Sequence, residues 1–326
     1  MKKLLSISLC VLMILSTLTL FGCGSKAQPV KFGLGVYTNV SAAGNAEGDT
    51  NGQGKVAITA AAITVDADGK VVACDLDTAD ITVAYTGDGK AIANDGFKTK
   101  AEQGDGYNMK AYGGATKEWY EQADAFETVV AGKTLAEIKA LIAEGDKGTA
   151  DVINAGCTIM VAEFVRAIEK AFANLSESEA TSAASVKLGV HTEQTLTDAT
   201  EEKDGKNQVE TTVFAAAVVD GKIVAASSDC IQVAFTFDAK GASTYDLSKA
   251  VTGKKEAGAN YGMKAYGGAA KEWFEQAAAF DAATIGKTAG EISSLMGADN
   301  YGNADLKTAG CTILVNGLVK AASKIG

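Results

Sequence analysis

The sequence repeats one long segment almost unchanged. Residues 107–123 read YNMKAYGGATKEWYEQA, and residues 261–277, which lie 154 positions later, read YGMKAYGGAAKEWFEQA. The same spacing separates two AGCTI strings at 155–159 and 309–313. A spacing that holds across an unlike stretch indicates a duplicated domain, and each copy is long enough to bury a core of its own. We therefore expect two similar domains that carry two similar sites.

The first part of each copy has the pattern of antiparallel strands. Residues 55–65 and 209–219 are rich in Val, Ile, Thr and Ala, and an Asp-Gly pair follows each run. Asp-Gly between apolar runs is typical of a β-hairpin turn. Further strand-like runs follow in both copies, at 70–73, 81–86, 222–226 and 231–237. Each copy is thus predicted to open with an antiparallel meander.

The second part of each copy is predicted to be helical. Apolar residues recur at helical spacing in the first copy at Trp119, Ala123, Phe126 and Val130. A Thr and a Glu three positions apart fit a capping box at 134–137 and again at 288–291. A last helix is expected after AGCT, with apolar residues at 161, 165, 168 and 172.

These patterns predict an α+β fold with two homologous domains, each an antiparallel strand meander followed by helices. The first domain is expected at 29–173 and the second at 186–326. Residues 174–185 are polar and lack an apolar pattern, so we expect a hinge-like linker there, where proteases would cut first.

The first residues read as an export signal. Lys2 and Lys3 precede an apolar run over 4–20, which ends in Gly22-Cys23. This ending is similar to a bacterial lipobox, and it predicts a signal peptide at 1–23 with Cys23 as the lipidated residue. The protein would then be anchored in the lipid bilayer of the cell membrane and would face away from the cytoplasm. An ordinary cleaved signal and an uncleaved anchor are the alternatives.

The charge and the single histidine exclude several functions. The net charge is −10, the isoelectric point is near 4.8 and Arg166 is the only arginine, which argues against a nucleic-acid partner because phosphate binding needs clustered cations. One histidine cannot supply a repeated zinc site or a repeated Ser-His-Asp triad, so we expect no metal and no catalytic residues. His191 is expected to be an exposed strand residue, in the position that Tyr37 takes in the first copy.

Four cysteines remain beyond the leader: Cys74, Cys157, Cys230 and Cys311. An exported protein can form disulfides, so one bond within each domain, Cys74 to Cys157 and Cys230 to Cys311, is possible. Three pairings of four cysteines exist, and free thiols are equally compatible with the sequence.

The repeated Ala-Gly-Cys-Thr string suggests a binding site. We expect Thr158 and Thr312 to begin a helix, where free amides and the helix dipole favour an anion such as a phosphate ester. Gly156 and Gly310 would let a bulky group approach the backbone. The alternative is that each threonine only caps its helix.

The chain resembles the FMN-binding domain family of the NqrC and RnfG subunits of ion-pumping complexes and of tandem-domain lipoproteins for extracellular electron transfer. The resemblance rests on Gly-Lys hairpins at 69–71 and 221–223 and on AGCT, which corresponds to the family's Ser-Gly-Ala-Thr with Ala and Cys in place of Ser and Ala. It implies FMN esterified to Thr158 and Thr312, loaded by a flavin transferase and reduced by a membrane electron donor. The protein would then be an electron carrier more than a stand-alone enzyme.

The repeated YxMKAYGG segment would complete such sites. Tyr112 and Tyr266 could stack on an isoalloxazine ring, and Lys110 and Lys264 could balance a reduced, anionic flavin. Trp119 and Trp273 are expected in the core, and the Glu pairs at 118/121 and 272/275 on a solvated helix face. The alternative function is a flavin-free surface lipoprotein that binds a small ligand or a protein partner, with a purely structural surface antigen as a weaker possibility.

The lipid anchor can be tested directly. Replacing Cys23 with Ala should release the protein to the medium or block its processing, because the acylated cysteine is the membrane attachment. Fractionation and N-terminal mass measurement of the natively expressed protein check this. Membrane retention equal to that of the wild type, with an unmodified N-terminus, would contradict it.

Overall fold

The computed structural model describes residues 27–326, so the predicted leader and Cys23 lie outside the described residues. The strands of the first half are β1 (Lys31–Gly44), β2 (Gly52–Val65), β3 (Val71–Tyr85) and β4 (Ala91–Ile92). Its helices are α1 (Lys100–Gln103), α2 (Met109–Gly113), α3 (Trp119–Val130), α4 (Leu135–Lys139), α5 (Ala150–Ala155) and α6 (Ala162–Ala173), with 3-10 turns at Gly104–Tyr107 and Glu144–Asp146.

The second half repeats this order. Its strands are β5 (Ser185–Thr197), β6 (Gly205–Val219) and β7 (Lys222–Phe237). Its helices are α7 (Lys254–Ala257), α8 (Trp273–Thr284), α9 (Ala304–Ala309) and α10 (Asn316–Ala322), with 3-10 turns at Gly258–Tyr261, Ala289–Leu295 and Ser323–Ile325. The predicted α+β fold with two similar halves, each a strand meander followed by helices, is confirmed.

Both sheets are antiparallel meanders, in the orders β1-β2-β3-β4 and β5-β6-β7. The turn between β6 and β7 has positive φ at Asp220 (50°) and Gly221 (74°), the pairing that a two-residue hairpin requires. The third strand of each meander is longer than the sequence suggested, because buried carboxylates interrupt its apolar pattern. Asp77 in β3 and Asp229 in β7 accept backbone N–H bonds from Ala101 (3.2 Å) and Lys255 (2.8 Å), so the strand continues through them.

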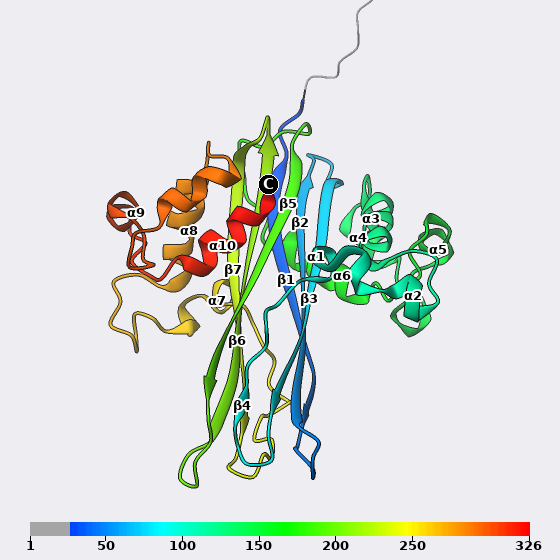
Figure 1. Cartoon of the computed structure of the whole chain (residues 1–326). Coiled ribbons are helices and arrows are strands. Elements are labelled where there is room, and N and C mark those ends of the chain that lie inside the picture. The colour runs from blue at the N-terminus through cyan, green and yellow to red at the C-terminus, as the bar shows by residue number, and fades with distance from the viewer. Residues whose placement is uncertain (1–26) are drawn as a thin grey trace, which may run out of the picture.

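The two sheets lie face to face in the middle of the molecule, with helices on both outer sides (Figure 1). Their inner faces share one apolar core, to which β2 contributes Val56 and Ile58 and β6 contributes Val209 and Val213, each at most 1% exposed. Strand β1 lies against β7, and β3 lies against β5. In the repeat, β1 is the counterpart of β5, and β3 is the counterpart of β7. The contact of β1 with β7 is therefore the counterpart of the contact of β5 with β3, which indicates an approximate two-fold symmetry between the halves.

Equivalent residues meet across this two-fold relation. The Tyr85 and Phe237 rings, which end β3 and β7, are fully buried and stack with centroids 4.3 Å apart and planes 10° apart. Two ion pairs between the halves follow the same symmetry. Lys170 contacts Glu256 at 2.6 Å, and their counterparts in the repeat, Lys324 and Glu102, are in contact at 2.5 Å. The halves are therefore packed as the subunits of a symmetric dimer would be.

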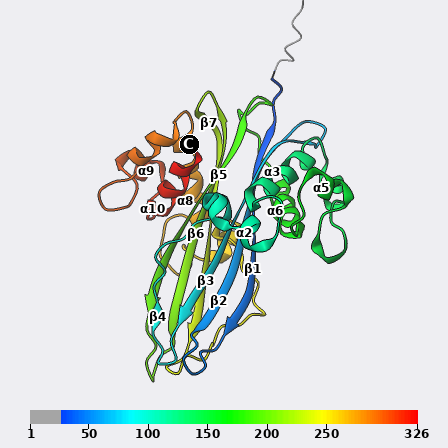
Figure 2. The same cartoon turned by 45° about the vertical axis from the view of Figure 1, so that its right-hand side comes forward.

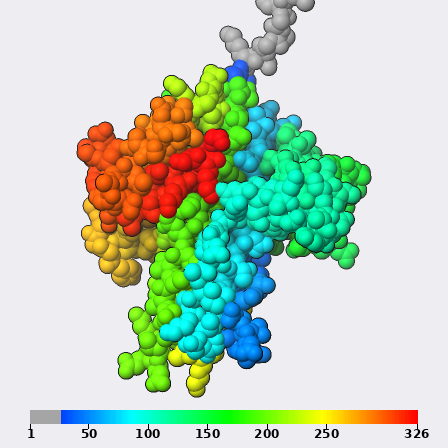
Figure 3. Space-filling model, in the orientation of Figure 1, coloured from blue at the N-terminus to red at the C-terminus, as the bar shows by residue number. Residues whose placement is uncertain are grey.

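The helices of each half cover the outer face of that half's own sheet (Figures 1 and 2). In the first half, Ile63 of β2 packs in one core with Phe126 of α3 and Ile168 of α6. In the space-filling view the two helical groups stand on opposite sides of the strands (Figure 3). The predicted helix at Trp119–Val130 and both predicted capping boxes are present. Within residues 27–326 no helix is long and apolar enough to cross a bilayer.

The polar segment at 174–185 lies along the start of β1. Phe32 exchanges backbone hydrogen bonds with Ser176 (3.1 and 2.9 Å), and the Val30 N–H donates to the Ala180 carbonyl (3.1 Å). Ala180 is buried as well. The polar composition of this segment suggested a hinge. In the structure its backbone groups form hydrogen bonds with β1 and the residues just before it, and composition does not predict such bonds.

The disulfides that an exported location would allow are absent, because all four cysteines in the described part of the chain are free thiols. Cys230 instead donates a weak hydrogen bond to Glu210 (3.4 Å). Burial raises the pKa of Cys157 and of Cys311 to about 11, so both stay protonated at neutral pH.

A carboxylate that is buried in the second half and partly buried in the first joins the long helix to the third strand. Glu127 of α3 accepts the Leu76 N–H (2.8 Å), and Asp281 of α8 accepts the Ser228 N–H (3.0 Å) and hydroxyl (2.7 Å). Burial raises the pKa of Glu127 to about 8, with Asp75 nearby adding to the effect, and burial raises the pKa of Asp281 to about 6. The folded protein therefore binds these protons more tightly than the unfolded chain does.

The aromatic stack should carry much of the stability of the sheet interface. Phe237→Ala should lower the free energy of unfolding by about 3–5 kcal/mol, because it removes a fully buried ring and leaves a cavity. Urea unfolding measures this, with Tyr112→Ala as the control because Tyr112 is 88% exposed. Equal stability of the two variants would show that the stack does not hold the halves together.

Stability should also depend on pH. A pKa raised in the folded state contributes stability below the unfolded pKa, which is 4.5 for Glu127, and this contribution is lost as pH rises through about 8. The free energy of unfolding should therefore fall as pH rises across this window, and Glu127→Gln should flatten the slope near its upper end. Urea titrations at a series of pH values test the slope, and an unchanged slope in the variant would refute the assignment to Glu127.

Candidate functional site

The two AGCT strings lie after a short helix and not before one. Gly156 ends α5 and Gly310 ends α9 with left-handed φ values of 102° and 101°. Thr158 follows in a segment that is neither helix nor strand, and α6 begins only at Ala162. The prediction that the threonines begin a helix is therefore wrong, and so is the alternative that they cap one.

The physical reason is the burial pattern of this segment. Cys157 and Val161 are fully buried and fix its two ends, while Thr158 is exposed. The Val161 N–H donates to the Asp146 carbonyl (2.8 Å), which fixes the segment just before the first turn of α6. The second half repeats this with Cys311, Thr312 and Val315, so neither threonine reaches the free amides of a helix N-terminus.

A buried glutamine holds each threonine. Gln122 of α3 is 1% exposed, and its Oε1 accepts both the backbone N–H (2.8 Å) and the hydroxyl (2.9 Å) of Thr158. Gln276 of α8 is also 1% exposed and binds Thr312 through the same two bonds at the same distances. Sequence reasoning missed these residues, although the repeated string EWxEQ contained the signal.

The glycine of each AGCT string is required by the backbone. A side chain at Gly156 would be strained at this φ and would collide with the side chain of Lys117, and Gly310 stands in the same relation to Lys271. The backbone thus requires glycine at both helix ends, and the role of leaving room for a bulky group stays a prediction.

A pocket of about 620 Å³ opens beside Thr158. Trp119 and Tyr107 form part of its wall, together with Met109 and Ile159. Three cations and two carboxylates also line it, namely Lys100, Lys147, Arg166, Asp146 and Glu163. The pocket is therefore locally positive by one charge in a protein whose net charge is −10. Its volume is within the usual range for small-molecule sites, roughly 300–1,000 Å³.

Lys100 is the most enclosed cation of this pocket. Its side chain is 16% exposed, and Nζ lies 5.3 Å from the Tyr107 ring centre and 5.8 Å from that of Trp119. Such contacts with aromatic faces hold an ammonium in place. Its ion pair with Asp80 is long, at 3.4 Å, so its charge is only partly balanced. Sequence reasoning missed Lys100, although a lysine precedes the tyrosine by seven positions in both copies.

The second half keeps this arrangement but balances the charge. Lys254 lies 5.4 Å from the Tyr261 ring centre and 5.9 Å from that of Trp273, and it pairs with Glu210 at 2.9 Å. The side chain of Lys254 is only 9% exposed. The two sites therefore share their aromatic contacts and differ in local charge.

The residues around the first strand also differ between the halves. Arg166 donates to the Tyr37 hydroxyl (2.8 Å) and lies over its ring, whereas Lys320 pairs with Glu193 (2.9 Å) in the second half. His191 is partly buried beside Glu193, and burial, followed by the charge of Lys320, lowers its pKa. The expected exposed histidine is thus half-buried in a charged cluster.

The second tyrosine of each YxMKAYGG segment, Tyr112 in the first half and Tyr266 in the second, does not line the pocket beside Thr158. Tyr112 and Tyr266 are 88% and 92% exposed, and Lys110 pairs with Glu121 (3.2 Å) at the surface. Lys264 contributes its backbone N–H to Glu272 (3.3 Å). The structure brings Thr158 together with Tyr107, Met109 and Trp119 instead.

Glu118 and Glu272 are not solvated, contrary to expectation. Glu118 is 2% exposed, and its carboxylate accepts the N–H groups of Met109 (2.7 Å) and Lys110 (3.2 Å), while its own N–H donates to Glu121 (2.8 Å). Glu272 makes the same contacts with Met263 and Lys264. Each glutamate therefore ties the YxMK segment to the helix that carries the glutamine.

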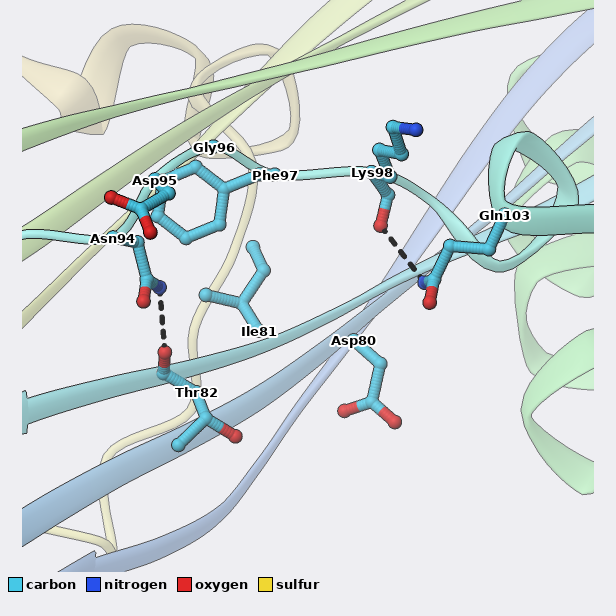
Figure 4. A pocket seen from close by; sticks show the side chains of 9 residues that line it. All are labelled: Asp80, Ile81, Thr82, Asn94, Asp95, Gly96, Phe97, Lys98 and Gln103. Carbon is cyan, nitrogen blue, oxygen red and sulfur yellow. Dashed lines mark hydrogen bonds between the residues drawn. The ribbon is translucent and has the colours of Figure 1, made fainter. Parts of the chain in front are cut away.

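A second pocket, of about 510 Å³, lies between β3 and the loop that precedes α1 (Figure 4). Two of its polar side chains bond to backbone carbonyls of the same pocket: Asn94 donates to the Thr82 carbonyl (2.9 Å) and Gln103 to the Lys98 carbonyl (3.3 Å). None of the predicted site residues lines it. Among residues 27–326 no cluster of three or more His, Cys, Asp or Glu side chains could hold a metal.

Comparison with known proteins finds little similarity. No protein-family model matches the chain, and no solved structure matches it. The sequence is 46% identical over 43 residues to a chlorophenol reductase of Desulfitobacterium hafniense. That match covers 13% of this chain and 13% of the reductase. It shows a short similar stretch, which is not enough to show a common family.

Proposed function

We propose that this chain is a membrane-anchored, extracytoplasmic electron carrier that holds FMN at two similar sites, on Thr158 and Thr312. The observation that carries the proposal is the repeated exposed threonine, which in the first half lines a positive, partly aromatic pocket. The resemblance of the AGCT strings and hairpins to the FMN-binding domains supports the cofactor. A flavin transferase and a membrane electron donor are the partners that this function requires.

The first-half pocket suits a flavin on three physical grounds. Its volume, about 620 Å³, accommodates a ligand of this size, and Trp119 and Tyr107 present aromatic surface. Arg166 and Lys147 supply positive charge for a phosphate. When bound, FMN supplies the redox chemistry, and the protein sets its surroundings.

In this proposal Lys100 balances the charge of a reduced, anionic flavin, which is the role that the sequence suggested for Lys110. An ammonium enclosed by aromatic rings stabilises negative charge nearby more strongly than one at the surface, because the solvent screens it less. Lys254 is neutralised by Glu210, so the second site stabilises added negative charge less. We therefore propose that a flavin in the first half is the easier one to reduce.

The alternative function is a flavin-free surface lipoprotein that binds a small ligand in the same pocket. Its excess of one positive charge and its aromatic lining favour a small anionic ligand that carries an aromatic group. Both functions use the same residues and differ in whether the threonine hydroxyl is esterified.

Intact mass of protein purified from the native host tests the first proposal. Thr158→Ala should remove one flavin and Thr312→Ala the other, and the double variant should carry none. Both side chains are exposed and neither caps a helix, so folding should be retained.

Thr128→Ala is the control, because Thr128 is an exposed helix residue that bonds only to the Asp124 carbonyl in α3. Native-host protein without flavin mass on either threonine peptide would reject covalent loading. Loss of both flavins in each single variant would reject two independent sites.

A further inference from the structure

We infer that Gln122 and Gln276 are positioning residues that orient the hydroxyl groups of Thr158 and Thr312 toward an incoming ligand. The inference rests on the proposed function and deepens it, since it names what prepares the two attachment points. The contact occurs in both halves across the same separation of 36 residues and with the same distances, 2.8 Å to the amide and 2.9 Å to the hydroxyl.

The orientation of each glutamine amide follows from its partners. Gln122 Nε2 donates to the Lys117 carbonyl (3.1 Å), and Gln276 Nε2 donates to the Lys271 carbonyl (3.1 Å). A backbone carbonyl can only accept, and the Thr158 backbone N–H can only donate. The side-chain oxygen must therefore face the threonine, and a flipped amide would lose both bonds.

This orientation decides what the threonine hydroxyl can do. Because Gln122 Oε1 accepts the hydroxyl proton, the lone pairs of Thr158 Oγ1 remain for groups on the pocket side. The glutamine is 1% exposed and bonded through both of its polar atoms, so its position is rigid. An amide does not take up the proton, so the glutamine sets geometry and supplies no acid or base.

A purely structural role would need only the backbone bond. Any residue except proline at position 158 could donate its backbone N–H to Gln122, whereas the side-chain bond made here requires the hydroxyl of Thr or Ser. The repetition of the hydroxyl bond in both halves, on an exposed side chain, indicates that the hydroxyl itself is being held.

The test compares loading of the two halves within one molecule. Gln122→Leu should lower flavin on the Thr158 peptide about tenfold, as expected for a lost hydrogen bond, while the Thr312 peptide stays loaded as the internal control. Gln276→Leu should show the reverse. Peptide masses after expression in the native host for a fixed time measure both.

Gln122→Glu provides the rescue. A protonated carboxyl group can donate to the Lys117 carbonyl and accept from Thr158, whereas a carboxylate would repel that carbonyl. Loading of this variant should therefore rise as pH falls in a reconstituted loading reaction with the transferase. Gln122→Asn, which is shorter by one methylene, should not rescue at any pH.

A second measurement does not need flavin. In a double-mutant cycle, Gln122→Leu and Thr158→Val should give unfolding midpoints in urea that are clearly non-additive, because each removes one side of the same hydroxyl bond. The cycle is measured on protein made without the transferase. Additive midpoints would overturn the inference.

The outcomes separate the two proposals. Wild-type loading on both threonines together with full loading of Gln122→Leu would overturn the positioning role and leave the electron carrier intact. A wild type without flavin would reject the electron carrier, and the double-mutant cycle alone would then decide whether Gln122 orients the hydroxyl.

Discussion

The burial of one sheet against the other is the constraint on which the rest of this structure depends. Each sheet has apolar residues on both faces, so the helices of its own half can cover only one of them. The other face finds its cover in the duplicate half, with Tyr85 stacked on Phe237 where equivalent strands end. Duplication thus supplies the second half of a core, as dimerisation does for separate chains. The two sites are consequently held on opposite outer sides of one rigid double sheet (Figure 1).

The start of the long helix organises the site in each half. Within five residues, Glu118 fixes the YxMK segment, Trp119 forms pocket wall, and Gln122 binds the exposed threonine. All three lie on the buried side of the first turns of α3, where backbone geometry fixes them relative to one another. Contacts within the site account for these residues of the repeated string, whereas the exposed Tyr112 makes no such contact.

The two halves have diverged in charge while keeping their geometry. Lys100 and Lys254 make the same aromatic contacts, yet the Glu210 carboxylate lies closer to Lys254 (2.9 Å) than the Asp80 carboxylate lies to Lys100 (3.4 Å). Screening by water is weak at such enclosed positions, so one carboxylate changes the local potential substantially. Under the proposed function, this difference in charge would make one flavin easier to reduce than the other.

Much of the fold was determined by local sequence. Apolar periodicity placed the helix at Trp119–Val130, Asp-Gly marked the hairpins, and Thr-x-x-Glu marked the caps, because each depends on residues near in sequence. The repeated threonine was also found from sequence alone. Tertiary structure decided what lies around it: Gln122 is 36 positions away, Lys100 is 58 positions away, and the core that fixes Cys157 and Val161 kept Thr158 out of the helix. These contacts join segments that are distant in sequence. Whole helices and strands must pack before such segments meet, so no local sequence pattern predicts the contacts.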